Sequence, residues 1–384
     1  MSFVYLDHNA TTPIDPRVLE KMLPYFTQVY GNAASVDHEF GHQALEAVNL
    51  AREQIAAAIN AEPDEIIFTS GATESDNIAL LGVAEKYARK GDHIITCVTE
   101  HKAVLDTCAR LERLGKRVTY LPVDQYGLVD PEDVRRAITP QTILVSIMAA
   151  NNEIGTLAPL AEIGQVTREH GVLFHTDAAQ AVGHVPLDVK AMNIDILSMS
   201  AHKMYGPKGV GALYRRRSNP RVLLEPVIYG GGHERGIRSG TLNVPGIVGF
   251  GEALEIAVNE MEVYTLHSRN LISHLLSQIE LEIKGISLNG HSVLRLPHNL
   301  SLVIPGVEGK ALSVRLGDIA LSTGSACTSA KVEPSHVIQA LGFDSSRAHN
   351  TIRISVGRFN KIDDINYAAK KIIKEAKLLQ ALIS

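Results

Sequence analysis

Lys203 stands at the end of a strongly apolar stretch, which is an unusual place for a lysine. The segment IDILSMSAHKMYGPKG covers residues 194–209 and places Ser200 and His202 just before this lysine. A surface lysine in a loop is the ordinary interpretation. A lysine in a partly desolvated cleft can instead lose its proton and form a Schiff base with a carbonyl group. These residues alone leave both interpretations open.

Asp177 follows another apolar stretch, in FHTDAAQAVG at residues 174–183. Aspartate often caps the start of a helix, so a structural role is the first interpretation. The second is a carboxylate held at the end of a strand to pair with a cationic ring, such as the pyridinium nitrogen of pyridoxal 5'-phosphate (PLP).

Two glycine-containing segments could bind an anion. In TSGATESDNIALLG, residues 69–82, a glycine turn leads from an apolar strand into a helix that begins near Thr73. Backbone N–H groups at such a start suit a phosphate, although the same pattern is typical of an ordinary helix cap. The segment GGGHERGIRSGT, residues 230–241, combines three glycines with a histidine and two arginines. It is either a solvated loop or an anion site.

Two further polar segments follow apolar strands. TEHKAV contains His101, and AANNEIG contains Asn151, Asn152 and Glu153. A lone histidine is more often structural than catalytic, so a catalytic role for His101 depends on which residues the fold brings beside it.

Cys327 lies in LSTGSACTSA, residues 321–330, directly among Ser, Thr, Gly and Ala. Small neighbours favour exposure and movement of this thiol, whereas an incidental cysteine in a loop is the alternative. The chain holds only 3 cysteines in 384 residues, and their spacing fits no metal site. We therefore expect no disulfide framework and a reducing compartment.

Alternating helices and strands must position these residues. Segments at residues 43–59 and 160–171 have the 3.6-residue apolar period of helices, and short apolar runs such as HIITCV, TILVSIMAA and IDILSMSAH fall between the helices. This alternation predicts an α/β fold with a mostly parallel central sheet flanked by helices on both faces. In such a sheet ligands bind at the carboxyl ends of the strands, where the polar residues above are found.

We expect two domains. Residues 15–260 carry the alternating pattern and form a large domain that holds Lys203 and Asp177. The pattern changes after about residue 260, so residues 1–14 together with 261–384 are expected to form a smaller α+β domain that carries Cys327.

The composition excludes several classes of protein. Hydrophobic residues make up 45% and charged residues 21%, and the net charge of −5 gives no reason to expect a nucleic-acid partner. No apolar run approaches the roughly 18–20 residues of a membrane span, and the first residues show no secretory signal. We therefore expect a cytoplasmic protein with no membrane partner.

Together the motifs resemble the cysteine desulfurases of the NifS/IscS family, which are fold-type-I PLP-dependent transferases. The form around Cys327, with a long loop of small residues, is similar to the IscS-like branch. The resemblance rests on segments that run in family order from residue 5 to residue 359: YLDHNATTP, GNAASVDHEFG, SGATESDN, TEHKAV, NNEIG, DAAQAVG, SAHKMYGPKG, GGGHERGIRSGT, STGSACTSA and IRISVGRF.

The resemblance implies how PLP is bound. Lys203 matches the lysine that forms a Schiff base with PLP, His101 the imidazole that stacks on its ring, and Asp177 the carboxylate that pairs with the ring nitrogen. Thr241 matches a threonine that reaches the phosphate of the neighbouring subunit, which implies a homodimer with shared active sites. Further cofactor-binding positions match the family at Ala72, Thr73, Asn152, Gln180, Ser200 and His202.

The resemblance also implies the reaction, with Lys203, His101 and Cys327 as the catalytic residues. Asn152 and Arg353 match groups that hold the carboxylate of the substrate, L-cysteine. Cys327 matches the cysteine that receives sulfur as a persulfide while L-alanine is released. An Fe–S scaffold protein or another acceptor protein would then take the sulfur for Fe–S cluster assembly. Whether Cys327 also ligates a transient [2Fe–2S] cluster, as the one metal-binding residue, is left open.

Rival activities differ in what they require. A selenocysteine lyase or another PLP-dependent β-elimination would use the same scaffold. An aminotransferase would need an α-keto acid and no essential thiol, which the Cys327 segment argues against. A non-catalytic scaffold protein would not need Lys203, Asp177 and His101 intact. A Rossmann-type dehydrogenase would need a G-x-G-x-x-G turn after the first strand, which the sequence lacks.

Overall fold

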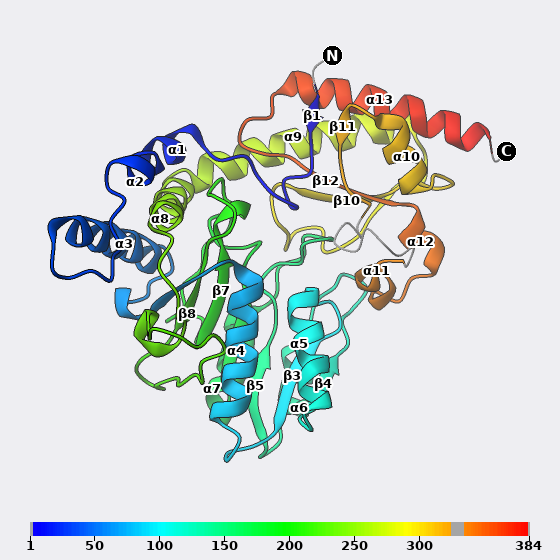
Figure 1. Ribbon diagram of the computed structural model, residues 1–384. Coiled ribbons are helices and arrows are strands. Elements are labelled where there is room, and N and C mark those ends of the chain that lie inside the picture. The colour runs from blue at the N-terminus through cyan, green and yellow to red at the C-terminus, as the bar shows by residue number, and fades with distance from the viewer. Residues whose placement is uncertain (1–2, 324–333, 383–384) are drawn as a thin grey trace.

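The computed structural model describes residues 3–323 and 334–382. Figure 1 shows a larger part built around a sheet and a smaller part at the upper right, whose outer side is formed by the C-terminal helix α13 (Ile362–Ala381). The N-terminal strand β1 (Val4–Tyr5) also lies in the smaller part. Within the described ranges, no helix is both long and apolar enough to cross a bilayer.

The larger part is organised around a seven-stranded sheet, counted over the described residues. In spatial order its strands are β2 (Ile66–Thr69), β8 (Gly211–Arg215), β7 (Ile196–Ser200), β6 (Leu173–Asp177), β5 (Thr142–Ser146), β3 (His93–Cys97) and β4 (Arg117–Leu121). Strand β8 is antiparallel to both of its neighbours, and the other neighbouring pairs are parallel. The predicted mostly parallel sheet is therefore confirmed.

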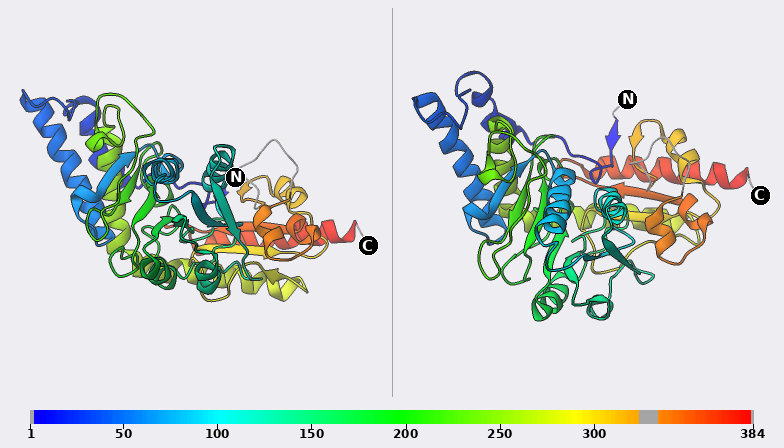
Figure 2. Two further views of the ribbon diagram at one scale, coloured as in Figure 1. Left: turned by 90° about the horizontal axis from the view of Figure 1, so that it is seen from below. Right: turned by 60° about the horizontal axis from the view of Figure 1, so that its bottom comes forward.

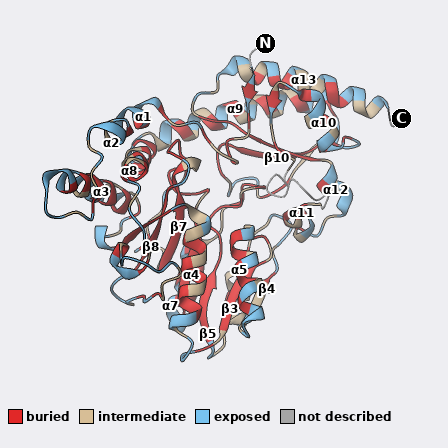
Figure 3. Cartoon of the chain, viewed as in Figure 1, coloured by how far each residue is buried: buried red, intermediate tan, exposed pale blue. Residues whose placement is uncertain are grey.

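Helices cover both faces of this sheet (Figure 2). Alternate strand residues point to opposite faces, so Ile67 packs in one apolar cluster whereas Ile66 and Phe68 pack in another. The Ile67 side is covered by α4 (Ala72–Lys86) and α5 (Lys102–Arg113). The other side is covered by α3 (Glu39–Ala58), α6 (Pro131–Ala137), α7 (Leu160–His170) and α8 (Val244–Asn259). Figure 3 shows the strands buried between helices whose outer residues are exposed.

The turns that connect strands to helices follow from their local sequence. Helix α6 begins at Asp130, whose side chain accepts a hydrogen bond from the Glu132 N–H, and Pro131 occupies the first helical position. Helix α7 ends at Gly171, whose φ of 64° is the left-handed conformation that glycine adopts most easily. Local sequence therefore fixes where α6 begins and where α7 ends, just before β6 begins at Leu173.

The smaller part has its own apolar core. An antiparallel sheet joins β12 (Thr351–Ser355), β10 (Asn299–Val303) and β9 (Ser287–Leu288), and β1 pairs in parallel with β11 (Ile319–Ala320). Val4 and Leu6 pack in one cluster with side chains of α9 (Met261–Glu282), α10 (Gly309–Leu316) and α13. Because residues 4 and 6 share this core with the C-terminal elements, we interpret the chain as two domains. Residues 15–260 form one domain, and residues 1–14 together with 261–384 form the other.

The remaining elements are short. They are α1 (Pro16–Met22), α2 (Pro24–Thr27), α11 (His336–Ala340), α12 (Ser345–His349) and three 3₁₀ turns, η1 (Pro63–Glu65), η2 (Ala201–Lys203) and η3 (Glu234–Gly236). Helices α11 and α12 pack against Ile154 of the larger part through Val337, Ile338, Leu341 and Ala348.

A buried ion pair fixes the glycine-rich segment 230–241 to the sheet. Both Nη atoms of Arg52 donate to the Glu234 carboxylate, at 2.9 and 2.8 Å, and Arg52 Nη1 also donates to the Ile66 carbonyl at 2.6 Å. The Phe68 N–H donates to the same carboxylate at 2.7 Å. Since both side chains are almost fully buried, each charge depends on the other for its stabilisation.

We expect Arg52→Ala to lower the free energy of unfolding by about 3–5 kcal/mol, because it leaves the Glu234 carboxylate buried without its cation. The measurement is urea unfolding followed by circular dichroism. Arg117→Ala, which breaks an exposed pair with Asp92, is the control and should change stability far less, because water screens an exposed pair. Equal losses in the two variants would contradict this account.

Candidate active site

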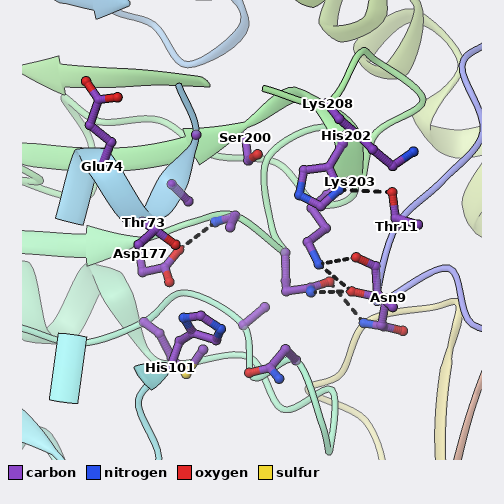
Figure 4. Close-up of a pocket in the computed structure, with 18 of the residues that line it drawn as sticks. Asn9, Thr11, Thr73, Glu74, His101, Asp177, Ser200, His202, Lys203 and Lys208 are labelled. Carbon is purple, nitrogen blue, oxygen red and sulfur yellow. Dashed lines mark hydrogen bonds between the residues drawn. The ribbon is translucent and has the colours of Figure 1, made fainter. Parts of the chain in front are cut away.

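The carboxyl ends of the central strands border one cavity of about 480 Å³. Its walls come from the segments after β2, β3, β5, β6 and β7, together with the N-terminal segment and β12. The cavity brings together ten of the residues that the sequence singled out (Figure 4): Ala72, Thr73, His101, Asn152, Asp177, Gln180, Ser200, His202, Lys203 and Arg353.

Lys203 ends the short turn η2, which follows β7 directly. Its Nζ donates hydrogen bonds to the backbone carbonyls of Asn9 and Ala10, at 2.6 and 2.8 Å (Figure 4). The Lys203 backbone carbonyl in turn lies 2.9 Å from His184 Nε2. The strand end, a histidine and the N-terminal segment therefore position the lysine amine at the cavity wall.

Asp177 is the last residue of β6 and is buried. Its Oδ1 accepts a hydrogen bond from the Ala179 N–H at 2.9 Å. Burial raises the pKa of this carboxyl, while the Ala179 N–H and the charges of His101 and Lys203 act in the opposite direction. A carboxylate at this position is thus prepared to pair with one more cationic group in the cavity.

Helix α4 begins at the cavity wall. Its N-cap, Gly71, has a φ of 153° and provides no side chain to cap the first N–H groups. Ala72 and Thr73 of the first turn line the cavity with Ser200. A helix start of this kind, with a positive dipole end and N–H groups to donate, suits a phosphate.

Two histidines of the cavity have defined surroundings. His101 is the N-cap of α5, and its Nδ1 accepts the Ala103 N–H at 3.2 Å. His202 Nδ1 lies 3.1 Å from Thr11 Oγ1. Burial and the positive charges of Lys203 and Lys208 lower the pKa of His202 to about 4, so its ring is neutral at physiological pH.

Arg353 reaches the cavity from β12 of the smaller part. Its Nη2 donates to Asp7 Oδ1 at 2.7 Å and its Nη1 donates to the Asn152 carbonyl at 2.8 Å. These two contacts orient a guanidinium that can bind a carboxylate through two parallel hydrogen bonds.

The sequence did not assign a role to the N-terminal residues that complete the site. Asn9 and Gln180 exchange two hydrogen bonds: Gln180 Nε2 donates to the Asn9 carbonyl at 2.9 Å, and Asn9 Nδ2 donates to Gln180 Oε1 at 3.0 Å. Asp7, Ala10 and Thr11 contact Arg353, Lys203 and His202 as described above. The available signal was the polar run DHNATT in the first motif, but only the fold brings it to the strand ends.

Two predicted site residues, Thr241 and Cys327, need separate comment. The structure places Thr241 on the surface, apart from the lining residues. Cys327 lies outside the described residues, so its expected approach to Lys203 stays a prediction. The described chain continues from residue 334. The next residue, Ser335, donates a hydrogen bond from its Oγ to Glu153 Oε2 at 2.5 Å. That contact ties the start of α11 to the larger part of the molecule.

A cluster of buried imidazoles lies beside the backbone of Lys203, which His184 contacts. The rings of His184 and His298 lie 4.5 Å apart between centroids, and His8 is buried nearby. Burial lowers the pKa of His8 and of His184 to about 4 and that of His298 well below its usual value. All three rings are therefore neutral in the folded protein near pH 7.

We expect His184→Gln to weaken the acid sensitivity of folding. Because the folded pKa of His184 is lowered, its contribution to stability is present above the unfolded pKa of about 6.5 and is lost as the pH falls toward 4. The free energy of unfolding of wild type minus that of the variant should therefore rise between pH 4 and pH 6.5 and level off above. A difference that does not change with pH would show that His184 is not neutral.

The chemistry of this cavity matches the needs of PLP. A buried carboxylate, an uncapped helix start and a strand-end lysine amine are the groups that bind a pyridinium ring, a phosphate and an aldehyde carbon. Together with the mostly parallel sheet, they define the class of α/β enzymes that hold PLP at the carboxyl ends of their strands.

Comparison with known proteins gives the family. Residues 4–367 match the family described as aminotransferase class-V, and the chain belongs to it. Proteins named cysteine desulfurase IscS from Anaeromyxobacter dehalogenans (strain 2CP-C) and Rickettsia bellii (strain OSU 85-389) are each 52% identical over 379 residues. These alignments cover 99% of this chain and 94% and 92% of the two relatives.

Solved structures agree with this assignment. A structure titled "NifS-like protein" has a TM-score of 0.91 and 40% identity, and the match covers 98% of this chain and 100% of that one. A structure titled "SspA in complex with cysteine" has a TM-score of 0.82 and 38% identity, with 93% and 100% of the two chains covered. The resemblance to NifS/IscS proteins and the predicted fold-type-I architecture are both confirmed.

Proposed function

We propose that this protein is a PLP-dependent cysteine desulfurase that converts L-cysteine to L-alanine and passes the sulfur to Cys327 as a persulfide. The observation that carries the proposal is the convergence of Lys203, Asp177 and Arg353 on one cavity. Their three side chains supply an amine, a carboxylate and a guanidinium, which are the groups that an amino-acid substrate and PLP require. The names of the relatives support the same reaction.

The residues that would hold PLP are assigned by their chemistry and by the resemblance to the NifS/IscS family. Asp177 would pair with the ring nitrogen, and the resemblance implies that His101 would stack on the ring and Gln180 would face the phenolic oxygen. The start of α4 would bind the phosphate through Ala72 and Thr73 with Ser200 and His202, and Asn152 would complete the cofactor site. When bound, PLP supplies an electron sink for the bonds at the substrate Cα.

Lys203 moves the substrate proton. Its amine would hold the cofactor through the carbonyl carbon of PLP, and the same amine is placed to accept the proton from the substrate Cα as a general base. The carbonyls of Asn9 and Ala10, which now accept hydrogen bonds from Nζ, give this amine a fixed place. Arg353 and Asn152 hold the substrate carboxylate, which orients the Cα–H bond toward Lys203.

Cys327 is the sulfur acceptor in this proposal. Its thiolate attacks the substrate sulfur, the Cβ–S bond breaks, and the electron pair stays on carbon and is later protonated to give alanine. An ordinary cysteine is only a few per cent thiolate at pH 7, so a positive or proton-accepting neighbour such as His101 must assist it. The persulfide then goes to an Fe–S scaffold protein or another acceptor, and Cys327 can ligate a transient [2Fe–2S] cluster as cargo.

The active enzyme is a homodimer with shared active sites in this proposal. Thr241 is exposed and apart from the cavity of its own chain, which suits a contact with the phosphate of a second subunit. Leu23, Phe26, Tyr30 and Phe40 are exposed apolar residues between the end of α1 and the start of α3, and an apolar surface of this kind favours association. A cytoplasmic location is consistent with thiol chemistry, because that compartment keeps cysteines reduced.

Lys203→Ala should abolish the visible absorbance of bound PLP and lower alanine formation by about 10²–10⁴-fold, since the amine that binds PLP and takes the proton is missing. Absorbance spectra of the purified protein and an alanine assay measure the two effects. Lys190→Ala, which removes a surface lysine paired with Glu62, is the control. A normal spectrum with full turnover in Lys203→Ala would rule out the assigned role.

Cys327→Ser should still bind PLP and L-cysteine but form no persulfide, because a hydroxyl cannot accept the sulfur. Cys108→Ala is the matched control, since burial raises the pKa of the Cys108 thiol to about 12 and leaves it unreactive. Mass spectrometry after incubation with L-cysteine detects the added sulfur. Normal persulfide and alanine formation by Cys327→Ser would show that another residue is the acceptor.

A further inference from the structure

A row of buried polar side chains crosses the central sheet beneath α4. The row consists of Thr96 of β3, Ser146 of β5, His175 of β6 and Ser198 of β7, all fully buried. On β5, β6 and β7, the residues two positions before the row are Leu144, Leu173 and Ile196. They pack in the apolar cluster that α4 and α5 cover. Since side chains two residues apart share a face of a strand, the row lies on the α4 side.

Asp177 extends this row toward the cavity. It lies two residues after His175 on the same face of β6 and is paired in register with Ser198 of β7. His175 Nδ1 lies 2.8 Å from Ser146 Oγ, and its Nε2 lies 3.0 Å from Ser198 Oγ. The polar row is therefore continuous with the carboxylate assigned to the ring nitrogen.

Asp76 of α4 adds a second carboxyl group to this row. It is completely buried, and its Oδ1 lies 3.6 Å from His175 Nε2. Among the described residues neither of its oxygens has a well-formed hydrogen bond. The nearby Ser198 hydroxyl only partly opposes the effect of burial and of Asp177, which together raise the pKa of Asp76 well above its usual value.

The two carboxyl groups differ in what stabilises a negative charge. Asp177 accepts the Ala179 N–H and has the basic side chains of His101 and Lys203 nearby. Asp76 has an imidazole beside it, and burial lowers the pKa of that His175 ring to about 3, so the ring carries no charge. Two buried carboxylates that interact cannot both ionise cheaply, and the environment decides which one holds the proton.

We propose that Asp76 is a neutral carboxylic acid that keeps its proton beside the His175–Ser198 pair, which leaves Asp177 as the single anion behind the cofactor. Asp76 is thus a positioning residue that acts through His175 and Ser198 and does not touch PLP. His175 accepts at Nε2 and donates from Nδ1 to Ser146. The inference rests on the PLP site proposed above for its functional meaning, but not for the protonation of Asp76.

The other titratable groups around Asp76 favour the same assignment. Glu100 follows β3, and a charge on it would raise the pKa of Asp76 further. Burial raises the pKa of Glu100 itself to about 8. On α5, which packs beside α4, the Cys108 thiol is neutral because burial raises its pKa. The basic side chains of His101 and Lys203 act on Asp177. The negative charge of Asp177 therefore adds to the cost of ionising Asp76.

The first test uses the protein without cofactor and compares wild type with Asp76→Asn. A carboxyl whose folded pKa is raised takes up a proton on folding, so its contribution to stability is lost as the pH rises above the unfolded value of about 4. The unfolding equilibrium constant of wild type, relative to the variant, should rise by about tenfold per pH unit above pH 4. Parallel pH curves for the two proteins would overturn the proposal.

Failure of Asp76→Asn to fold would also overturn it, because a neutral isostere must be tolerated where a neutral acid resides. Glu132→Gln is the control for removing a carboxyl group. Glu132 is exposed and paired with Arg135, so this change should not produce the tenfold slope.

The second test separates positioning from simple packing, with the dissociation constant of PLP and its visible absorbance as readouts. Asp76→Ala removes the carboxyl group that packs beside His175 and should weaken PLP binding by about fivefold to tenfold, whereas Asp76→Asn should restore it to within about twofold of wild type. Asp177→Asn, the same change at the ionised carboxylate, should weaken binding more than either. Equal losses for Asp76→Asn and Asp177→Asn would show that Asp76 is ionised and contradict the proposal.

The two tests fail in different ways. If PLP does not bind to wild-type protein at all, the proposed function fails while the pH dependence of the cofactor-free protein still reports on Asp76. If PLP binds but the pH curves are parallel, the proposed function stands and the inference about Asp76 is wrong.

Discussion

The site depends on keeping one negative charge at Asp177, at the end of a fully buried strand. Burial opposes that charge, so the surroundings must stabilise it. The Ala179 N–H and the basic side chains of His101 and Lys203 do so in the protein itself. The same requirement explains the neutral groups nearby, because an additional anion at this depth would compete with Asp177 for every positive charge. A cofactor with a cationic ring nitrogen would stabilise the Asp177 carboxylate further by adding a positive charge next to it.

A second constraint is that the cavity belongs to no single segment of the chain. Lys203 extends from the end of β7, but the carbonyls that hold its amine come from Asn9 and Ala10, nearly two hundred residues away. Arg353 comes from the smaller part and is oriented by Asp7 and by the Asn152 carbonyl of the larger part. The lysine and the arginine are thus positioned by contacts between the two parts of the molecule, and changes at their interface should reach both the amine and the carboxylate-binding group.

Charge is concentrated on few groups, and most of the surrounding titratable side chains are neutral. Burial lowers the pKa of His175, His184 and His202. Their rings act as hydrogen-bonding partners of a serine, a backbone carbonyl and a threonine. Neutral imidazoles orient their neighbours without adding charge to the cavity. In the proposed function, Lys203 and Arg353 are then the cations that meet the substrate amine and carboxylate.

The sequence determined the fold class and most of the site by local rules. Continuous apolar runs alternating with helical periods predicted the parallel sheet, and the known preference of such sheets for strand-end ligands placed Lys203, Asp177, His101 and Asn152 together. Only the tertiary structure decided the role of Asn9 and Thr11, because their contacts join positions far apart in the chain and leave no periodic signal. The tertiary structure also decided that Asp76 lies beside His175, because the sequence of α4 does not show which strand residues its buried face contacts. Local patterns report which face of an element is buried, whereas the charge of a buried group depends on which distant groups are buried with it.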